Sequence, residues 1–185
     1  MKKNLIASCL YTVITALILG LAYPVLVTGI ARLIFPEKAR GDLIIENGDL
    51  IGSYLIGQPF TGPGYFHSRP SAAGTGYDAS SSSGSNLAPT SKALSDRVSA
   101  SVAEEGTGSA VPIDLVTTSG SGLDPDITPA AALYQVTRVA RERKMSEEAV
   151  RQMVLSHITP RQFGLLGEPR VNVLELNLAL IHAHH

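Results

Sequence analysis

The 185-residue chain has a formal net charge of −1 at pH 7, one cysteine (Cys9) and no tryptophan. A single cysteine excludes an internal disulfide, so a hydrophobic core has to hold the fold together. The charge is unevenly placed: the first 40 residues carry five Lys and Arg against one Glu, and the rest carries 10 basic against 15 acidic residues. We expect no nucleic-acid partner for a body with this acidic balance.

The most informative segment runs from Asn4 to Ala31, where 28 consecutive residues carry no charge. As a helix rising about 1.5 Å per residue it would be about 42 Å long, which exceeds the roughly 30 Å of a bilayer's hydrocarbon core. The sequence therefore predicts one transmembrane helix over residues 5–35, preceded by a cytoplasmic N-terminus of residues 1–4. The basic start and the acidic body favour export of the body. We expect residues 36–185 to form one extracytoplasmic α+β domain.

Two other interpretations of this apolar segment have to be weighed. The small residues of Gly20-Leu21-Ala22 are suited to cleavage of a secretory signal, although the apolar run continues to Phe35 and would leave an apolar end on the product. A lipoprotein signal at Cys9 is disfavoured, because only five residues separate Lys3 from Cys9. An uncleaved helix remains the interpretation that accounts for the whole segment.

Small or compact residues recur every fourth position along the predicted membrane helix, and the other positions hold mainly Leu, Ile and Val. In lipid, close approach over small residues is what allows two helices to gain packing energy. The row predicts a face that docks on a partner helix, and chance recurrence of small residues is the alternative. Its members are Ser8, Thr12, Ala16, Gly20, Pro24 and Thr28.

The first half of the body begins with a hairpin signal. Asn47-Gly48 separates two apolar runs between residues 44 and 51, which predicts two antiparallel strands. Residues 71–85 are mostly Ser, Gly and Ala, the composition of a flexible linker, although loops this long in compact domains are either functional or disordered. A helix is expected from Pro89 and Thr90 to a stop at Gly106. A short strand is expected over residues 111–116.

Two helix caps organise the second half of the body. Thr128 followed by Pro129 predicts the start of one helix, whose basic end, residues 138–144, is expected to be solvated. Ser146 predicts the cap of the next helix. The last segment alternates leucines as a strand does but has helix-favouring residues, and we expect a strand over residues 171–173 followed by a helix to Ile181.

The sequence contains no recognisable catalytic arrangement. A hydrolase needs a nucleophile, a base and an orienting group, but no Gly-x-Ser-x-Gly motif is present. A phosphate-binding Gly-Lys-Ser/Thr loop is also absent. His67 and His157 lie outside any recognisable catalytic context, so a structural role is expected for both. We predict no catalytic residue and no metal site.

Four polar, turn-forming segments stand out instead: residues 65–70, 84–90, 118–125 and 167–177. Together with the N-terminal helix they resemble the C subunit of the bacterial Kdp potassium-transporting P-type ATPase, over essentially the whole chain and in the same order. The Ser-Gly-Ser-Gly-Leu-Asp-Pro and Gly-Glu-Pro-Arg-Val-Asn segments are the most specific parts of the resemblance. The extra serines at residues 80–83 and the His-rich end depart from the family pattern. The motif residues, expected either to form a docking surface or to lock the fold, are Phe66, His67, Arg69, Pro70, Ser85, Asn86, Pro89, Ser119, Gly120, Gly122, Asp124, Pro125, Gly167, Glu168, Pro169, Arg170, Asn172, Glu175 and Asn177.

The resemblance implies a non-catalytic subunit of an inner-membrane complex that imports potassium at very low external concentration. The implied partners are a channel-like potassium-translocating subunit, a P-type ATPase subunit and a small accessory membrane subunit, in a complex that uses ATP, Mg and potassium. The family is also described as a catalytic chaperone that raises the ATPase subunit's affinity for ATP. An exported domain cannot touch cytoplasmic nucleotide, so any such effect has to pass through the membrane helices. A membrane-tethered binding module and a cleaved secreted hydrolase are the alternative functions.

Overall fold

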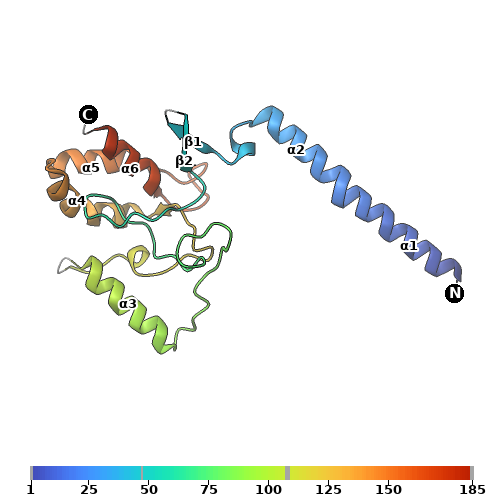
Figure 1. Ribbon diagram of the computed structural model, residues 1–185, viewed down its shortest axis with the longest axis horizontal. Coiled ribbons are helices and arrows are strands. Elements are labelled where there is room, and N and C mark those ends of the chain that lie inside the picture. The colour runs from blue at the N-terminus through green and yellow to red at the C-terminus, as the bar shows by residue number, and fades with distance from the viewer. Residues whose placement is uncertain (1, 47, 107–108, 184–185) are drawn as a thin grey trace. The chain divides into compact units, whose positions relative to one another are not determined.

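The computed structural model describes residues 2–46, 48–106 and 109–183 (Figure 1). The chain divides into two compact units, Met1–Ile51 and Gly52–His185. The first contains an apolar helix and most of a small hairpin, whose second strand ends at Ser53, and the second contains helices and a three-stranded sheet. The predicted α+β class is confirmed.

The N-terminal helix is continuous from Lys2 to Ile34 and is long and apolar enough to cross a membrane. It consists of α1 (Lys2–Leu17), a π-helical turn η1 (Ile18–Ala22) and α2 (Tyr23–Ile34). The wide turn has a local cause. Pro24 has no N–H to donate to the carbonyl of Gly20, and the N–H of Tyr23 bonds to the carbonyl of Ile18, five residues earlier.

The hairpin is present where the sequence predicts it. A 3₁₀ turn, η2 (Lys38–Arg40), leads into β1 (Leu43–Glu46) and β2 (Asp49–Ser53), which form a two-stranded sheet. Asn47 of the predicted Asn-Gly turn lies outside the described residues, and Gly48 has the left-handed φ of +91° that such turns require.

The second unit is built around α4 (Pro129–Arg143), α5 (Glu147–Ser156) and α6 (Val173–His182), which lie together in Figure 1. A sheet of β3 (Asp126–Ile127), β4 (Ile158–Thr159) and β5 (Arg170–Asn172) has the order β3-β5-β4, and both pairs are antiparallel. α3 (Lys92–Glu105) stands apart from α4, α5 and α6 within the same unit and has no buried residue.

The core is the apolar face of these helices together with the central strand. Its largest fully buried apolar side chains are Phe66, Leu176, Leu180, Val136, Val139, Val150, Val154, Val171 and Val173. The caps predicted from sequence are confirmed: the hydroxyl of Thr128 accepts from Ala131 N–H, and the hydroxyl of Ser146 accepts from Ala149 N–H. Asn172 caps α6 in the same way, a role the sequence analysis did not assign.

The expected strand over residues 111–116 is wrong. These residues contain the 3₁₀ helix η3 (Ile113–Leu115), which begins directly after Pro112. The buried carboxylate of Asp114 accepts the backbone N–H of Thr128 at 2.8 Å, so this segment bonds through a side chain where a strand would use its backbone. The short strands β3 and β4 were not predicted, because two residues are too few for a periodic pattern.

The serine-rich segment 71–85 is ordered by its own hydrogen bonds. The hydroxyl of Ser71 accepts from the N–H groups of Ala73 and Tyr77 and donates to the carbonyl of Gly122 at 2.6 Å. The N–H of Ser83 donates to the carbonyl of Ser121 at 2.9 Å. The composition typical of a linker therefore forms a closed loop that is fastened to residues 121 and 122.

The expected solvated helix end at residues 138–144 is also wrong in part. The side chain of Arg138 is 17% exposed, and its Nη1 donates to the carbonyls of Pro63 and Tyr65 at 2.7 and 3.0 Å. Arg143 lies over the Tyr65 ring, with its guanidinium carbon 4.4 Å from the ring centroid. These two arginines hold residues 63–65 against α4, while Arg141 is exposed as expected.

Candidate functional site

Six of the motif residues line one shallow groove of about 320 Å³ in the second unit. Three segments far apart in the chain form its walls: residue 69, residues 114–128 and residues 167–170. Antiparallel pairing of β5 with β3 brings the last two together, with Asp126 opposite Asn172. The lining residues are Arg69, Asp114, Asp124, Asp126, Ile127, Thr128, Gly167, Glu168, Pro169 and Arg170.

Arg69 holds the loop of residues 117–126 in place. Its Nη1 lies 3.3 Å from Oδ2 of Asp124, and its Nη2 and Nε donate to the carbonyls of Thr118 and Thr117 at 3.2 and 3.4 Å. The other carboxylate oxygen of Asp124 accepts the N–H of Asp126 at 3.1 Å. Hydrogen bonds within the chain therefore preorganise the polar wall of the groove.

A second ion pair crosses the groove between neighbouring strands. Nε of Arg170 lies 3.0 Å from Oδ2 of Asp126. Burial raises the pKa of Asp126 above its ordinary value; the guanidinium of Arg170 opposes this shift and the charge of Asp124 adds to it. At the rim, Nη2 of Arg161 lies 2.5 Å from Oε2 of Glu168. The groove is thus nearly charge-balanced.

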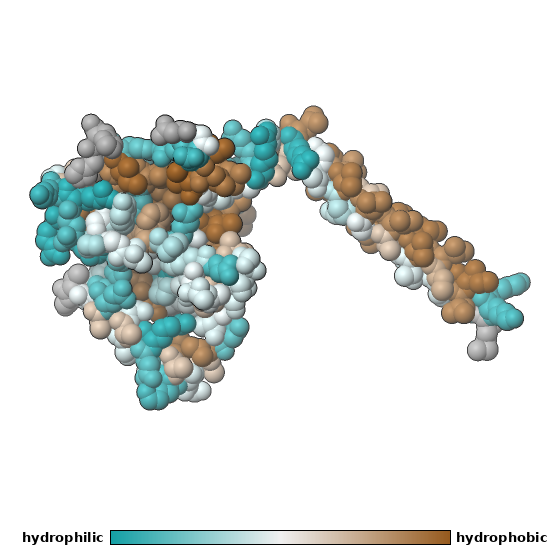
Figure 2. Space-filling model, in the orientation of Figure 1, coloured by the Kyte–Doolittle hydropathy of each residue, from teal (hydrophilic) through white to brown (hydrophobic). Residues whose placement is uncertain are grey.

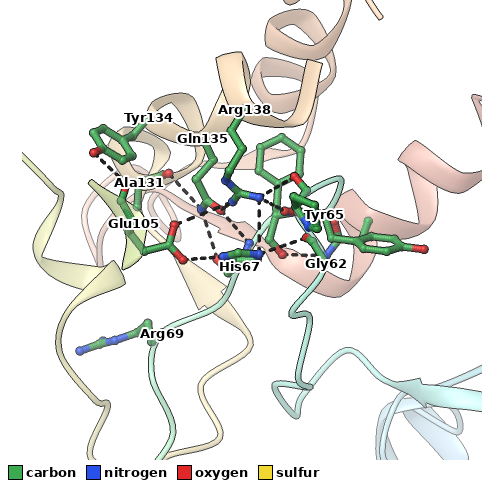
Figure 3. Close-up of polar contacts among 12 residues, drawn as sticks. Gly62, Tyr65, His67, Arg69, Glu105, Ala131, Tyr134, Gln135 and Arg138 are labelled. Carbon is green, nitrogen blue, oxygen red and sulfur yellow. Dashed lines mark hydrogen bonds and ion pairs between the residues drawn. The ribbon is translucent and has the colours of Figure 1, made fainter. Parts of the chain in front are cut away.

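His67 belongs to an interior polar network shown in Figure 3. Its Nδ1 lies 2.5 Å from Oε1 of Glu105 at the end of α3, and its Nε2 lies 3.1 Å from the carbonyl of Gly62. Its backbone N–H donates to Gln135 of α4 at 2.7 Å, and the amide nitrogen of Gln135 donates back to the carbonyl of His67 at 3.2 Å. His67 therefore connects α3, α4 and the turn at residue 62.

The charge of Glu105 is stabilised within this network. Burial by itself would raise the pKa of Glu105, but the hydrogen bond and the charge of His67, together with the charge of Arg138, hold that pKa below its ordinary value. Sequence reasoning missed Glu105 and Gln135 and placed Arg138 in solvent. Gln135 had a detectable signal, because it is a polar residue among the apolar positions of its helix, and the structure shows it to be 1% exposed.

The side-chain amide of Asn177 bonds to both backbone polar groups of Phe66 in the core, as a neighbouring strand would. The N–H of Phe66 donates to Oδ1 of Asn177 at 2.8 Å, and Nδ2 of Asn177 donates to the carbonyl of Phe66 at 2.9 Å. Both residues are 0% exposed. This amide therefore attaches the segment at residue 66 to α6, 111 positions later in the chain.

The motif residues thus fall into groups by position. Buried members are Phe66, Ser119, Gly122 and Asn177, and members of intermediate burial outside the groove are His67, Pro70, Ser85, Pro125 and Asn172. Exposed members outside the groove are Asn86, Pro89, Gly120 and Glu175. The groove members are Arg69, Asp124, Gly167, Glu168, Pro169 and Arg170.

The small-residue row lies in the first unit, along α1, η1 and α2. Its two hydroxyls with a described partner are satisfied within the helix: Ser8 donates to the carbonyl of Asn4 at 2.8 Å and Thr12 to that of Ser8 at 2.9 Å. A Cβ added at Gly20 would meet nothing within 4 Å. Figure 2 shows paler residues along one side of a helix that is otherwise mostly hydrophobic.

One Ser–His contact bears on the hydrolase alternative. The hydroxyl of Ser156 lies 3.2 Å from Nδ1 of His157 at the end of α5. Both groups are directed at the carbonyl of Met153, at 2.8 and 2.7 Å, so they cap the helix and do not form a nucleophile–base pair. Within the described residues, no group of three or more His, Cys, Asp and Glu side chains is arranged to hold a metal ion.

Comparison with known proteins identifies the family. Residues 5–182 match the family described as KdpC, the c chain of the K⁺-transporting ATPase. The chain belongs to this family. It is 61% identical to the potassium-transporting ATPase KdpC subunit of Koribacter versatilis, over 97% of this chain and 95% of that protein.

Two further relatives match over similar lengths. The KdpC subunit of Acidobacterium capsulatum is 59% identical over 98% of this chain and 100% of that protein. The KdpC subunit of Rhodopseudomonas palustris strain BisB5 is 53% identical over 97% of each chain. The resemblance carried by the four motif segments is therefore confirmed, and the groove and the interior network belong to a KdpC-family chain.

Proposed function

We propose that this chain is a non-catalytic accessory subunit of an ATP-driven, high-affinity potassium import complex. The observation that carries the proposal is the family match over residues 5–182, since the matched relatives are each called a potassium-transporting ATPase subunit. In this proposal the chain spans the cell inner membrane once, with its N-terminus in the cytoplasm and residues 36–185 in the periplasm. ATP, Mg and potassium are handled by the other subunits.

The apolar helix is proposed to dock on a membrane subunit of the same complex through the row from Ser8 to Thr28. Two features support this. The row allows close approach, because its side chains are small or compact. The hydroxyls of Ser8 and Thr12 are bonded within the helix, so the row leaves neither of them unsatisfied at a helix–helix interface. The proposed partners are the channel-like potassium-translocating subunit, the P-type ATPase subunit and the small accessory membrane subunit.

The groove is proposed as the docking surface of the periplasmic domain. An alternative role is to concentrate potassium near the channel mouth by negative charge. The groove and its rim hold the carboxylates of Asp114, Asp124, Asp126 and Glu168 against the guanidinium groups of Arg69, Arg161 and Arg170. Because Asp124, Asp126 and Glu168 are each paired with a guanidinium group at 2.5 to 3.3 Å, the field of these pairs is weak beyond the roughly 8 Å screening length of physiological salt. The near balance of charge therefore favours a docking role of the groove over concentration of potassium.

The effect on ATP affinity described for the family is proposed to act through the helix. A periplasmic domain has no access to cytoplasmic nucleotide, so the two sites have to be coupled by a conformational equilibrium of the membrane helices. The π turn η1 is one place where such a helix can change its register, because wide turns of this kind are often found at functional positions.

Co-purification of the complex tests the proposal. The full complex is extracted in mild detergent by an affinity tag on this chain, and the recovered polypeptides are identified. We expect a P-type ATPase and a channel-like polypeptide with the native chain. The variant Gly20→Leu should lose them, because a side chain in the row prevents close packing. The control is Gly29→Leu, which adds the same side chain outside the row, where a Cβ also meets nothing within 4 Å.

Two outcomes contradict parts of the proposal. If Gly20→Leu retains its partners as well as Gly29→Leu does, the row is not the docking face. If the native chain brings down neither an ATPase nor a channel-like polypeptide, the accessory-subunit function itself is wrong for this chain.

A further inference from the structure

The connection between β4 and β5 forms an exposed finger, residues 161–168, whose apolar tip at residues 163–166 lies outside the groove proposed for docking. The ten residues from 159 to 168 are all exposed. Phe163 is 89% exposed, Leu165 79% and Leu166 56%. Large apolar side chains grouped at one tip with nothing of their own domain to cover them indicate a surface that contacts something else.

The finger is held in a defined shape. Gln162 and Leu166 form an isolated β-bridge, with N–H···O distances of 2.9 Å in both directions. Phe163 and Gly164 turn the chain through left-handed φ angles of +56° and +74°. The ion pair between Arg161 and Glu168 closes the base. The apolar tip is therefore preorganised, which lowers the entropic cost of binding.

The link between the apolar helix and the second unit is short enough to keep a bilayer surface within reach of the finger. Seventeen residues separate Ile34, the last residue of the apolar helix, from Gly52, the first residue of the second unit. Even fully extended, such a tether reaches no more than about 60 Å, so a bilayer holding the helix keeps the domain near its surface. A convex tip can enter lipid without the matching cavity that a protein partner would have to supply.

The charges at the base suit the headgroup region. Arg161 and Arg170 are paired with Glu168 and Asp126, but their side chains are still 45% and 48% exposed, so each keeps part of its surface available to phosphate. Amphipathic elements that bind bilayers combine apolar residues at one end with such basic residues at the headgroup level, and they bury their apolar part about 5–10 Å deep.

We propose that residues 161–168 form a membrane-contacting finger, in which Phe163, Leu165 and Leu166 enter the interface of the bilayer and Arg161 lies among the phosphates. The finger would fix the orientation of the domain relative to the membrane. The inference rests on anchoring of the chain by its apolar helix. It is independent of the ATPase partners and of which side of the membrane holds the domain.

The absence of tryptophan from the chain makes the test specific, because one introduced tryptophan is the only one present. The full-length variant Phe163→Trp is reconstituted alone in vesicles of phosphatidylcholine with a minority of phosphatidylglycerol. Its emission is compared in plain vesicles and in vesicles whose lipids carry bromine near the headgroup end of the acyl chain. Leu165→Trp reports on the same tip at a residue that does not need a positive φ.

The matched control is Ile113→Trp, because Ile113 is 69% exposed on η3 of the same domain. We expect blue-shifted emission at positions 163 and 165, quenched several-fold more strongly by the brominated lipids than emission at position 113. Circular dichroism of each variant verifies that the domain is folded.

Three outcomes overturn the inference. Water-like emission at both finger positions, unaffected by brominated lipid, means that the finger stays in solvent. Equal quenching at position 113 means that the domain lies near lipid without specific contact through the finger. Protection of the finger that is seen only in the assembled complex, without quenching by lipid, means that its partner is a protein pocket. Failure of the accessory-subunit function in the co-purification experiment leaves this result unchanged.

Discussion

Replacement of Asn177 by leucine tests the interior role of the motif residues most directly. The two side chains have the same number of heavy atoms and branch at the same carbon, so the main change is the loss of the amide that pairs with both backbone groups of Phe66 at 2.8 and 2.9 Å. Because Phe66 and Asn177 are 0% exposed, water cannot replace the lost partners. The N–H and the carbonyl of Phe66 would be left unsatisfied in the core.

The size of the effect follows from these two groups. An unsatisfied buried backbone group costs about 1–3 kcal/mol, so the two cost about 2–6 kcal/mol. Burial of the leucine side chain offsets about 1.5–3 kcal/mol of this. We expect Asn177→Leu to lower the free energy of unfolding by about 2 kcal/mol, which corresponds to roughly 5–10 °C in Tm for a domain of this size.

Asn172→Leu is the matched control. Its side chain also accepts one backbone N–H, from Glu175 at 3.1 Å, and donates to one carbonyl, that of Tyr54 at 2.9 Å, but both bonds are exposed. Water can replace them, so we expect only the cost of a lost helix cap, about 1 kcal/mol. Urea unfolding of the full chain in mild detergent, followed by near-ultraviolet circular dichroism of the tyrosines, measures both variants. Equal losses at positions 172 and 177 would refute the argument from burial.

Two further predictions concern the motif and the interior network. Gly122→Ala should destabilise the domain by more than about 2 kcal/mol, because Gly122 has a φ of +67° and a Cβ there would lie 2.5 Å from the carbonyl oxygen of Ser83. Gly120→Ala, where a Cβ meets nothing within 4 Å, should change the free energy of unfolding by less than about 0.5 kcal/mol; similar losses in the two variants would contradict the reasoning. The folded-state pKa of Glu105 is below its ordinary value of 4.5, so its contribution to stability is present above that pH and is lost as the pH falls toward the folded-state pKa. Glu105→Gln should therefore flatten the loss of stability below about pH 4.5 in urea titrations at several pH values, and an unchanged pH profile would show that Glu105 carries no such linkage.

The sequence was sufficient for features that depend on neighbouring residues. The apolar helix, the caps at Thr128 and Ser146 and the final strand-to-helix change all follow from composition, spacing or bonds within three or four positions. Such interactions are formed by the local chain in any fold that contains these elements. The four motif segments were also sufficient to indicate the family, which the comparison over residues 5–182 confirms.

Only the tertiary structure decided which motif residues are buried and stabilise the fold and which lie at the surface. Asn177 and Asp124 are both polar members of motif segments, but one is fully buried against Phe66 and the other lines a groove with Arg69. Their partners lie 111 and 55 positions away in the chain. No local pattern encodes contacts at that separation, because they exist only after the sheet and the helices have brought the segments together. The same reason explains why Arg138, expected in solvent, is instead bound to the carbonyls of Pro63 and Tyr65.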